Sequence, residues 1–93
     1  MSIVVRFSPR SVTPQQYDEA SERVDQELGK EMPDGCDYHV AFIGPDGNIR
    51  VSEIWDSPEQ LEAFGQRLMP LLAELGIEAG EPEVLQIHNI QRR

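Results

Sequence analysis

Apolar residues recur along this chain with two spacings, which separate the expected strands from the expected helices. Residues 2–7 form a β-branched run that ends at Ser8-Pro9, as is typical of a strand. Further along, an apolar stripe with spacings of three, four and four is formed by Tyr17, Ala20, Val24 and Leu28. That spacing places the stripe on one face of a helix, which we expect to end at Gly29.

A second helix is expected over the segment that follows Ser57. Thr13-Pro14-Gln15-Gln16 and Ser57-Pro58-Glu59-Gln60 each supply a capping hydroxyl, a proline at the first helical position and a glutamine at the third. The second helix buries a face formed by Leu61, Phe64, Leu68, Leu71, Leu72 and Leu75. Because Pro70 lacks an amide proton, we expect a kink or a restart near Met69, and Gly76 should end the helix.

Two further apolar runs, residues 38–43 and 49–55, flank a strong turn signal at Gly44-Pro45-Asp46-Gly47-Asn48. This combination predicts a β-hairpin. Two registers are open at this point. A three-residue loop with a glycine bulge places His39 opposite Glu53, whereas a four-residue loop places Tyr38 there.

Residues 83–90 supply the last expected strand, so that the order of elements is β-α-β-β-α-β. We therefore expect an α+β protein with the ferredoxin-like βαββαβ arrangement. In that arrangement a four-stranded antiparallel sheet carries both helices on one face. A chain of 93 residues fits one such domain, spanning residues 1–93.

Neither face of the expected sheet is cleanly polar. One face of the third strand carries Ile49, Val51, Glu53 and Trp55, and the other carries Arg50, Ser52 and Ile54. Two helices cover only one face, and a large exposed apolar face is unfavourable in water. We therefore expect a homodimer in which two sheets pack face to face and form a barrel.

The net charge of the chain argues against two classes of binding partner. Seventeen acidic residues against eight basic ones give a formal net charge of −9. Nucleic acids and anionic membrane surfaces require clustered Lys and Arg, so neither is an expected partner. The single cysteine, Cys36, cannot form an internal disulfide, and no apolar N-terminal segment resembles a secretory signal, so we expect a cytoplasmic protein.

Three ionisable residues are the candidates for catalysis. Histidine is the side chain best suited to act as a base at neutral pH, and the chain has only His39 and His88. Glu53 lies among apolar residues on its strand face and is the third candidate. The alternatives are a strand histidine at the dimer seam for His88 and a structural pair of Glu53 with His39 or an arginine. No local ligand motif is present, so no metal site is expected.

The segment VSEIWDSPEQLEAF, residues 51–64, resembles the strand-to-helix segment of the dimeric α/β-barrel superfamily. Within that superfamily it is most similar to antibiotic-biosynthesis-monooxygenase-like proteins, where an acid-x-Trp-acid pattern precedes the helix. The resemblance implies a dimer with a cleft between sheet and helices that admits a small organic molecule. Cofactor-free monooxygenases, isomerases and haem-degrading enzymes share this fold. The haem-degrading relatives place a histidine on the second helix, where residues 61–75 have none, so we expect no cofactor.

Two hypotheses on function follow. In the first, the homodimer binds an apolar or aromatic molecule and acts on it as a cofactor-free monooxygenase or isomerase. Glu53, His39 and His88 are then its catalytic candidates, and Trp55, Tyr38 and Phe64 its substrate-binding ones. A cavity of at least about 300 Å³ would support this hypothesis, whereas a cleft filled by aromatic side chains would not. In the second, the protein is a non-catalytic dimerisation or stress-associated module, with His39 and Glu53 as a strand pair and Trp55 as core.

Overall fold

The computed structural model describes residues 2–93 and contains six regular elements. In chain order they are β1 (Ile3–Phe7), α1 (Pro14–Leu28), β2 (Cys36–Ile43), β3 (Ile49–Trp55), α2 (Pro58–Glu74) and β4 (Glu83–Gln86). The strands form one sheet in the order β2-β3-β1-β4, and every neighbouring pair is antiparallel. The predicted ferredoxin-like α+β fold is confirmed.

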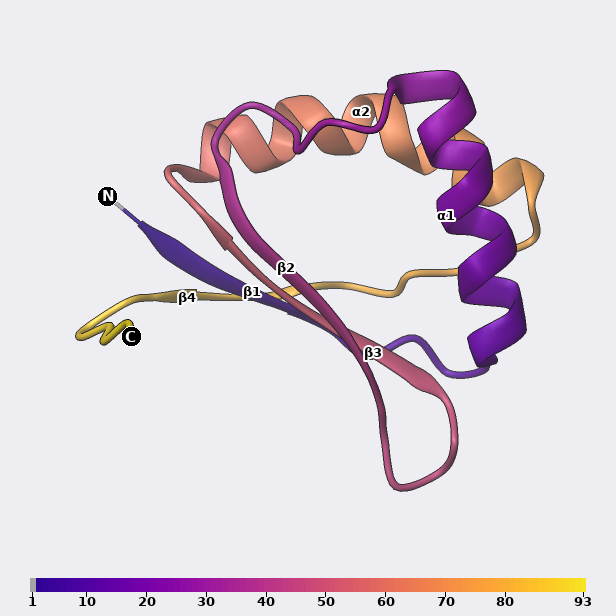
Figure 1. Ribbon diagram of the computed structural model, residues 1–93, viewed down its shortest axis with the longest axis horizontal. Coiled ribbons are helices and arrows are strands. Elements are labelled where there is room, and N and C mark those ends of the chain that lie inside the picture. Colours follow the sequence, from indigo (N-terminus) through magenta and orange to yellow (C-terminus); the bar gives the residue numbers. More distant parts are fainter. Residues whose placement is uncertain (1) are drawn as a thin grey trace.

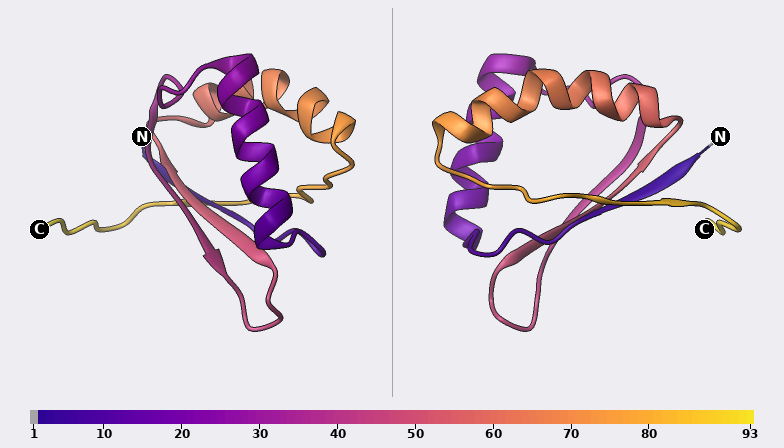
Figure 2. Two further views of the ribbon diagram at one scale, coloured as in Figure 1. Left: turned by 45° about the vertical axis from the view of Figure 1, so that its right-hand side comes forward. Right: turned by 180° about the vertical axis from the view of Figure 1, so that it is seen from behind.

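Both helices lie on the same side of the sheet, as predicted. Figure 1 shows α2 running across the top of the molecule and α1 crossing it on the right, with the sheet below them. The two other views show the same one-sided arrangement (Figure 2). The helices thus leave the opposite side of the sheet uncovered; we call this side the outer face. No helix among the described residues 2–93 has the length and apolar character needed to cross a bilayer.

The helix starts differ in one detail from the prediction. At α1 the capping box is complete, because the Thr13 hydroxyl accepts from the Gln16 amide at 3.1 Å and the Gln16 side chain accepts from the Thr13 amide at 2.9 Å. At α2 the Ser57 hydroxyl accepts from the Gln60 amide at 3.3 Å. The Gln60 side-chain oxygen, however, accepts from that same hydroxyl at 2.9 Å rather than from a backbone amide. The second box is therefore only half formed.

Helix α2 continues through Pro70, so of the two predicted alternatives, a kink or a restart near Met69, the restart does not occur. A proline inside a helix removes one backbone hydrogen bond. Here apolar side chains on both sides of Pro70 face the interior: Leu68 lines the space under the helices, and Leu71 is 7% exposed. This packing holds the helix together across the missing bond.

The hairpin adopts the first of the two predicted registers. The Gly44 amide donates to the Asn48 carbonyl at 2.8 Å, which closes a loop of three residues, and Gly47 within that loop has a φ of +83°. Glycine takes such a left-handed conformation without steric cost. The resulting register pairs His39 with Glu53 and puts both side chains on the same face of the sheet.

An irregularity in β2 changes which residues face the helices. The pairing with β3 shifts between Cys36 and Tyr38, so Cys36 pairs with Trp55 while Tyr38 pairs with Ile54. This bulge lets Cys36 and His39, three positions apart, both face the helices. The strand begins two residues earlier than the predicted 38–43 segment.

The last strand is shorter than the predicted 83–90 segment. Gln86 pairs with Ile3, the first residue of β1, and only the Ile87 amide reaches further, donating to the Ser2 carbonyl at 3.3 Å. Residues after Ile87 lie past the start of β1, and no strand within residues 2–93 pairs with them. His88 and the residues that follow it are therefore exposed and outside the sheet.

Candidate functional site

A cavity of about 530 Å³ lies between the helices and the sheet; we call it the helix–sheet cavity. Most of its wall is apolar and includes Val12, Val24, Leu28, Phe64, Leu68 and Leu72. Phe64 thus lines the cavity instead of filling it. The volume exceeds the roughly 300 Å³ at which small-molecule sites begin.

Three of the polar side chains that line this space are joined to one another by hydrogen bonds: Tyr17 from α1, His39 from β2 and Glu53 from β3. His39 Nδ1 lies 2.6 Å from Glu53 Oε2, and His39 Nε2 lies 2.7 Å from the Tyr17 hydroxyl. The Glu53 side chain is 12% exposed and that of His39 is 34% exposed. The cavity wall thus carries a histidine with both ring nitrogens in hydrogen bonds.

The second carboxylate oxygen of Glu53 is also occupied. Trp55 Nε1 donates to Glu53 Oε1 at 2.9 Å. The two residues are two positions apart on β3 and therefore face the same side of the sheet. Trp55 is 0% exposed and packs against Phe64, with ring centroids 5.8 Å apart. Tyr17, His39, Glu53 and Trp55 form a continuous set of hydrogen bonds, which we call the four-residue network.

For a neutral imidazole, the chemistry of these groups sets the direction of each bond. The indole N–H can only donate, and an ionised carboxylate can only accept. With Glu53 ionised, His39 Nδ1 carries a proton and donates it to Oε2. The neutral imidazole then has its lone pair on Nε2, which accepts from the Tyr17 hydroxyl.

Burial and negative charge shape the titration of two groups beside the cavity. Burial raises the pKa of Tyr17, and the carboxylates of Glu53, Asp18 and Asp25 raise it further, so the phenol keeps its proton at neutral pH. Burial also raises the pKa of the Cys36 thiol, with a further contribution from Glu53. A thiol with a raised pKa is a poor nucleophile, which counts against a catalytic cysteine.

The structure brings only some of the predicted site residues together. His39, Glu53 and Phe64 all line the helix–sheet cavity, and Trp55 lies behind them as the hydrogen-bond partner of Glu53. Tyr38 pairs with Ile54 on the outer face and is 53% exposed. His88 lies beyond β4 and is not part of the cavity wall.

Tyr17 is the site residue that sequence reasoning missed. The helical spacing places it first in an apolar stripe whose other members, Ala20, Val24 and Leu28, carry no side-chain polar atom. That contrast is the signal that could have identified it. The only hydroxyl on a buried stripe requires a partner, because burying a polar group without a hydrogen bond is unfavourable.

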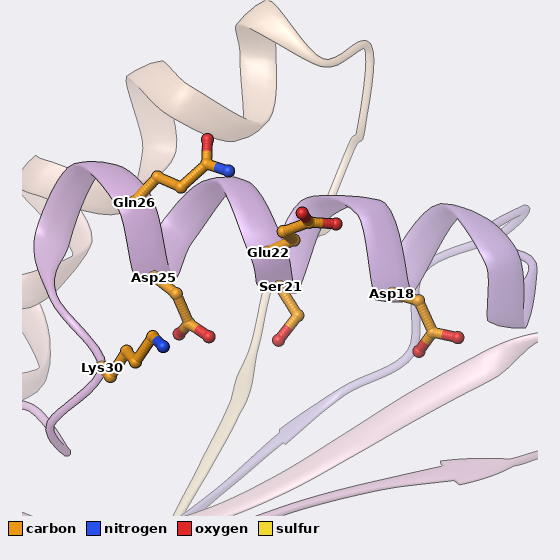
Figure 3. Close-up of a pocket in the computed structure, with 6 residues that line it drawn as sticks. All are labelled: Asp18, Ser21, Glu22, Asp25, Gln26 and Lys30. Atoms are coloured by element: carbon orange, nitrogen blue, oxygen red, sulfur yellow. The ribbon is translucent and has the colours of Figure 1, made fainter.

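A second hollow, of about 450 Å³, runs along α1 (Figure 3). Six residues line it: Asp18, Ser21, Glu22, Asp25, Gln26 and Lys30. All belong to α1 or follow it directly, and the wall is mostly acidic and polar. It does not contain His39 or Glu53, and we interpret it as a solvated helix surface. Among residues 2–93, no three His, Cys, Asp or Glu side chains are grouped so as to hold a metal ion.

The sheet order, the one-sided helices and the cavity define the class of protein: a ferredoxin-like α+β fold with a ligand-sized cavity under its helices. Comparison with solved structures shows which known proteins share this fold. The chain is similar to a candidate antibiotic biosynthesis monooxygenase from Chloroflexus aurantiacus J-10-fl, at 25% identity and a TM-score of 0.62, over 98% of each chain.

Two further solved structures show the same fold. SnoaB, a cofactor-independent oxygenase from Streptomyces nogalater, is 16% identical with a TM-score of 0.61, over 99% of this chain and 96% of SnoaB. A candidate antibiotic biosynthesis monooxygenase from Deinococcus radiodurans is 12% identical with a TM-score of 0.60, over 100% and 98% of the two chains. No family model matches the sequence. No curated protein matches it either. The predicted resemblance to antibiotic-biosynthesis-monooxygenase-like proteins is confirmed in fold over nearly the whole chain.

Proposed function

We propose that this protein binds a small apolar or aromatic molecule in the helix–sheet cavity and removes a proton from it. One observation carries the proposal. An apolar cavity of about 530 Å³ has the hydrogen-bonded pair of His39 and Glu53 in its wall. An apolar wall with a few converging polar groups is the usual form of a small-molecule site.

His39 is the proposed base, and Glu53 is its positioning residue. Both oxygens of Glu53 are engaged, one by His39 and one by Trp55, so the carboxylate holds the imidazole in one orientation. When His39 gains a proton, the adjacent carboxylate stabilises the imidazolium. The predicted role of Glu53 as a base is thereby replaced in this proposal by a supporting role.

Loss of a proton from an acidic C–H or phenol leaves an electron-rich anion. Such an anion can take up a proton at another carbon, which is isomerisation, or it can react with molecular oxygen. The fold shared with SnoaB, a cofactor-independent oxygenase, favours the second outcome. Neither outcome requires a metal or an organic cofactor.

The proposal is tested with anthrone, an aromatic ketone whose methylene protons are acidic. In D₂O, wild-type protein should speed the loss of the methylene signal by NMR, and oxygen uptake shows whether oxygenation follows. Replacing His39→Gln should lower the exchange rate by about 10²–10⁴-fold, because glutamine cannot take up the proton. His88→Gln is the matched substitution at the other histidine. If His88→Gln lowers the rate and His39→Gln does not, the base is wrongly assigned; if wild type gives no acceleration, the proposed activity is wrong.

We also propose that the functional unit is a homodimer joined through the outer face. Tyr38, Phe42 and Leu85 are 53%, 39% and 44% exposed, although all three are large and apolar. Tyr38 and Leu85 lie at the two ends of one row across the sheet, in which Ile54 and Val4 stand between them. Exposed apolar surface of this kind is typical of protein interfaces. Light scattering should give about twice the chain mass of 10.5 kDa, and a mass of one chain at micromolar concentration would contradict this proposal.

One observation favours the competing hypothesis of a non-catalytic module. His39 and Glu53 are a directly opposed strand pair, and Trp55 is fully buried, as that hypothesis requires. The Glu53→Gln substitution described in the Discussion distinguishes the two hypotheses.

A further inference from the structure

We propose that Tyr17 is a second catalytic group of this site, which passes the proton of the bound molecule to His39. This inference rests on the proposed function, since it concerns the same cavity and the same base. It assigns a task to a residue whose contact with His39 joins α1 to the sheet.

The position of Tyr17 is the first observation. Its hydroxyl lies 2.7 Å from His39 Nε2, and its ring lies nearly parallel to the imidazole, with the ring centroids 6.3 Å apart and an interplanar angle of 19°. Both side chains line the helix–sheet cavity. A molecule in the cavity can therefore touch the phenol and the imidazole from the same side.

The hydrogen-bond directions supply the second observation. A neutral imidazole has one lone pair, and the Tyr17 hydroxyl occupies it at Nε2. A bound molecule cannot give its proton to His39 while that bond persists. The Tyr17 oxygen, however, still has lone pairs with which to accept a hydrogen bond.

The transfer then balances in one step. The bond between the substrate and its proton breaks, and its electron pair stays on the substrate. That proton binds to the Tyr17 oxygen while the original Tyr17 proton moves to His39 Nε2. Tyr17 remains neutral, His39 becomes an imidazolium beside Glu53, and the new Tyr17 O–H donates to the substrate anion.

The protonation state of Tyr17 agrees with this role. Burial and the negative charges of Glu53, Asp18 and Asp25 all raise the pKa of the phenol, so the hydroxyl carries a proton at neutral pH. The backbone around it is also fixed. The Tyr17 amide donates to the Thr13 carbonyl at 3.0 Å in the first turn of α1, directly after the complete capping box.

The test uses 4-nitrophenol, whose ionised form absorbs visible light, and 4-nitroanisole, its methyl ether, which has no proton to give. Each is titrated with wild-type protein, Tyr17→Phe and the exposed α1 variant Glu19→Gln, at a pH below the pKa of free 4-nitrophenol. Wild type and Glu19→Gln should bind 4-nitrophenol largely as phenolate. In Tyr17→Phe the ratio of phenolate to phenol should fall roughly tenfold or more, because the bound phenolate loses the Tyr17 O–H donor; an unchanged ratio would mean that His39 takes the proton directly. Binding of 4-nitroanisole should not change.

Each outcome has a distinct meaning. If Tyr17→Phe ionises 4-nitrophenol as well as wild type does, the role of Tyr17 is wrong while the proposed function stands. If neither probe binds wild type, the proposed function fails and this inference fails with it. Imidazole ¹⁵N NMR of wild type gives a measurement that does not depend on the variant folding. His39 should gain a second ring proton when 4-nitrophenol binds, and an unchanged neutral ring would overturn the inference.

Discussion

The two faces of the sheet carry opposite combinations of polarity and burial. The face under the helices holds a carboxylate, Glu53, that is only 12% exposed. The outer face exposes large apolar side chains, with Tyr38 at 53% and Leu85 at 44%. A soluble single-layer sheet with helices on one face usually shows the reverse, with apolar residues covered and polar residues in water.

The proposed site and the proposed dimer interface account for this difference between the two faces. On the helix side, every side-chain N or O atom of the four-residue network has a partner within the network, and both carboxylate oxygens of Glu53 accept hydrogen bonds. On the outer face, the apolar residues have no cover from their own helices (Figure 2). The hydrogen-bonded network under the helices fits the proposed ligand site, and the uncovered apolar residues of the outer face fit the proposed dimer interface.

The largest expected effect is on stability, from shortening the buried tryptophan on the helix side. Trp55→Ala should lower the free energy of unfolding by about 3–5 kcal/mol, because it leaves a cavity and removes a donor from Glu53. Urea unfolding measures this change. Ile54→Ala, at the adjacent position on the outer face, is the matched variant and should cost less when the protein is monomeric. An equal loss of unfolding free energy in both variants would contradict the proposed difference between the helix side and the outer face.

The next effect separates catalysis from structure at Glu53. Glu53→Gln keeps the shape but cannot stabilise an imidazolium, so anthrone exchange should fall roughly 10²-fold. The free energy of unfolding should change by only about 1 kcal/mol, because glutamine still accepts from Trp55. A large loss of stability together with unchanged exchange would support the non-catalytic module instead.

A smaller effect is expected on the outer face. Leu85→Glu places a charge in the proposed dimer interface, where it would be buried without a partner, and should weaken association by roughly 100-fold or more. The mass from light scattering should fall toward that of one chain, while unfolding of the monomer changes little because Leu85 is exposed there. Persistence of the dimer would place the interface elsewhere.

The smallest effect is a dependence of stability on alkaline pH. The pKa of Tyr17 in the folded state is raised above its ordinary value of 10.0. At a pH between the unfolded pKa and the folded pKa, the folded state therefore retains a proton that the unfolded state has lost. Stability should therefore be constant below the unfolded pKa and decline as pH rises through the folded pKa. Cys36, raised above 9.0, adds a decline of the same sign. Unfolding curves of Tyr17→Phe should show a shallower alkaline decline than wild type, and equal slopes would contradict the assignment.

Local signals in the sequence were sufficient for most of the fold. The turn at residues 44–48 predicted the hairpin, and one of its two possible registers set His39 opposite Glu53. The capping signal at Thr13 predicted the start of α1. Each of these features depends on residues close together in the chain, where spacing determines geometry.

The remaining features depend on contacts between distant segments. The contact of Tyr17 with His39 joins residues 22 positions apart and depends on how α1 lies across the sheet. The bulge between Cys36 and Tyr38 has no glycine of its own and was not predictable from turn residues. The length of β4 is set by where β1 begins, and the continuity of α2 at Pro70 is set by packing.

The division of the helix–sheet cavity between helices and sheet has a consequence for how this protein could change over evolution or in engineering. Val24, Leu28, Leu68 and Leu72 shape the wall from the helices, whereas His39 and Glu53 project from paired strands whose register is fixed by the hairpin. Helix side chains other than Tyr17 can therefore be exchanged to alter the shape of the ligand that the proposed site accepts, while the strand-borne pair stays in place. Such a scaffold allows specificity to drift while its reaction chemistry is inherited.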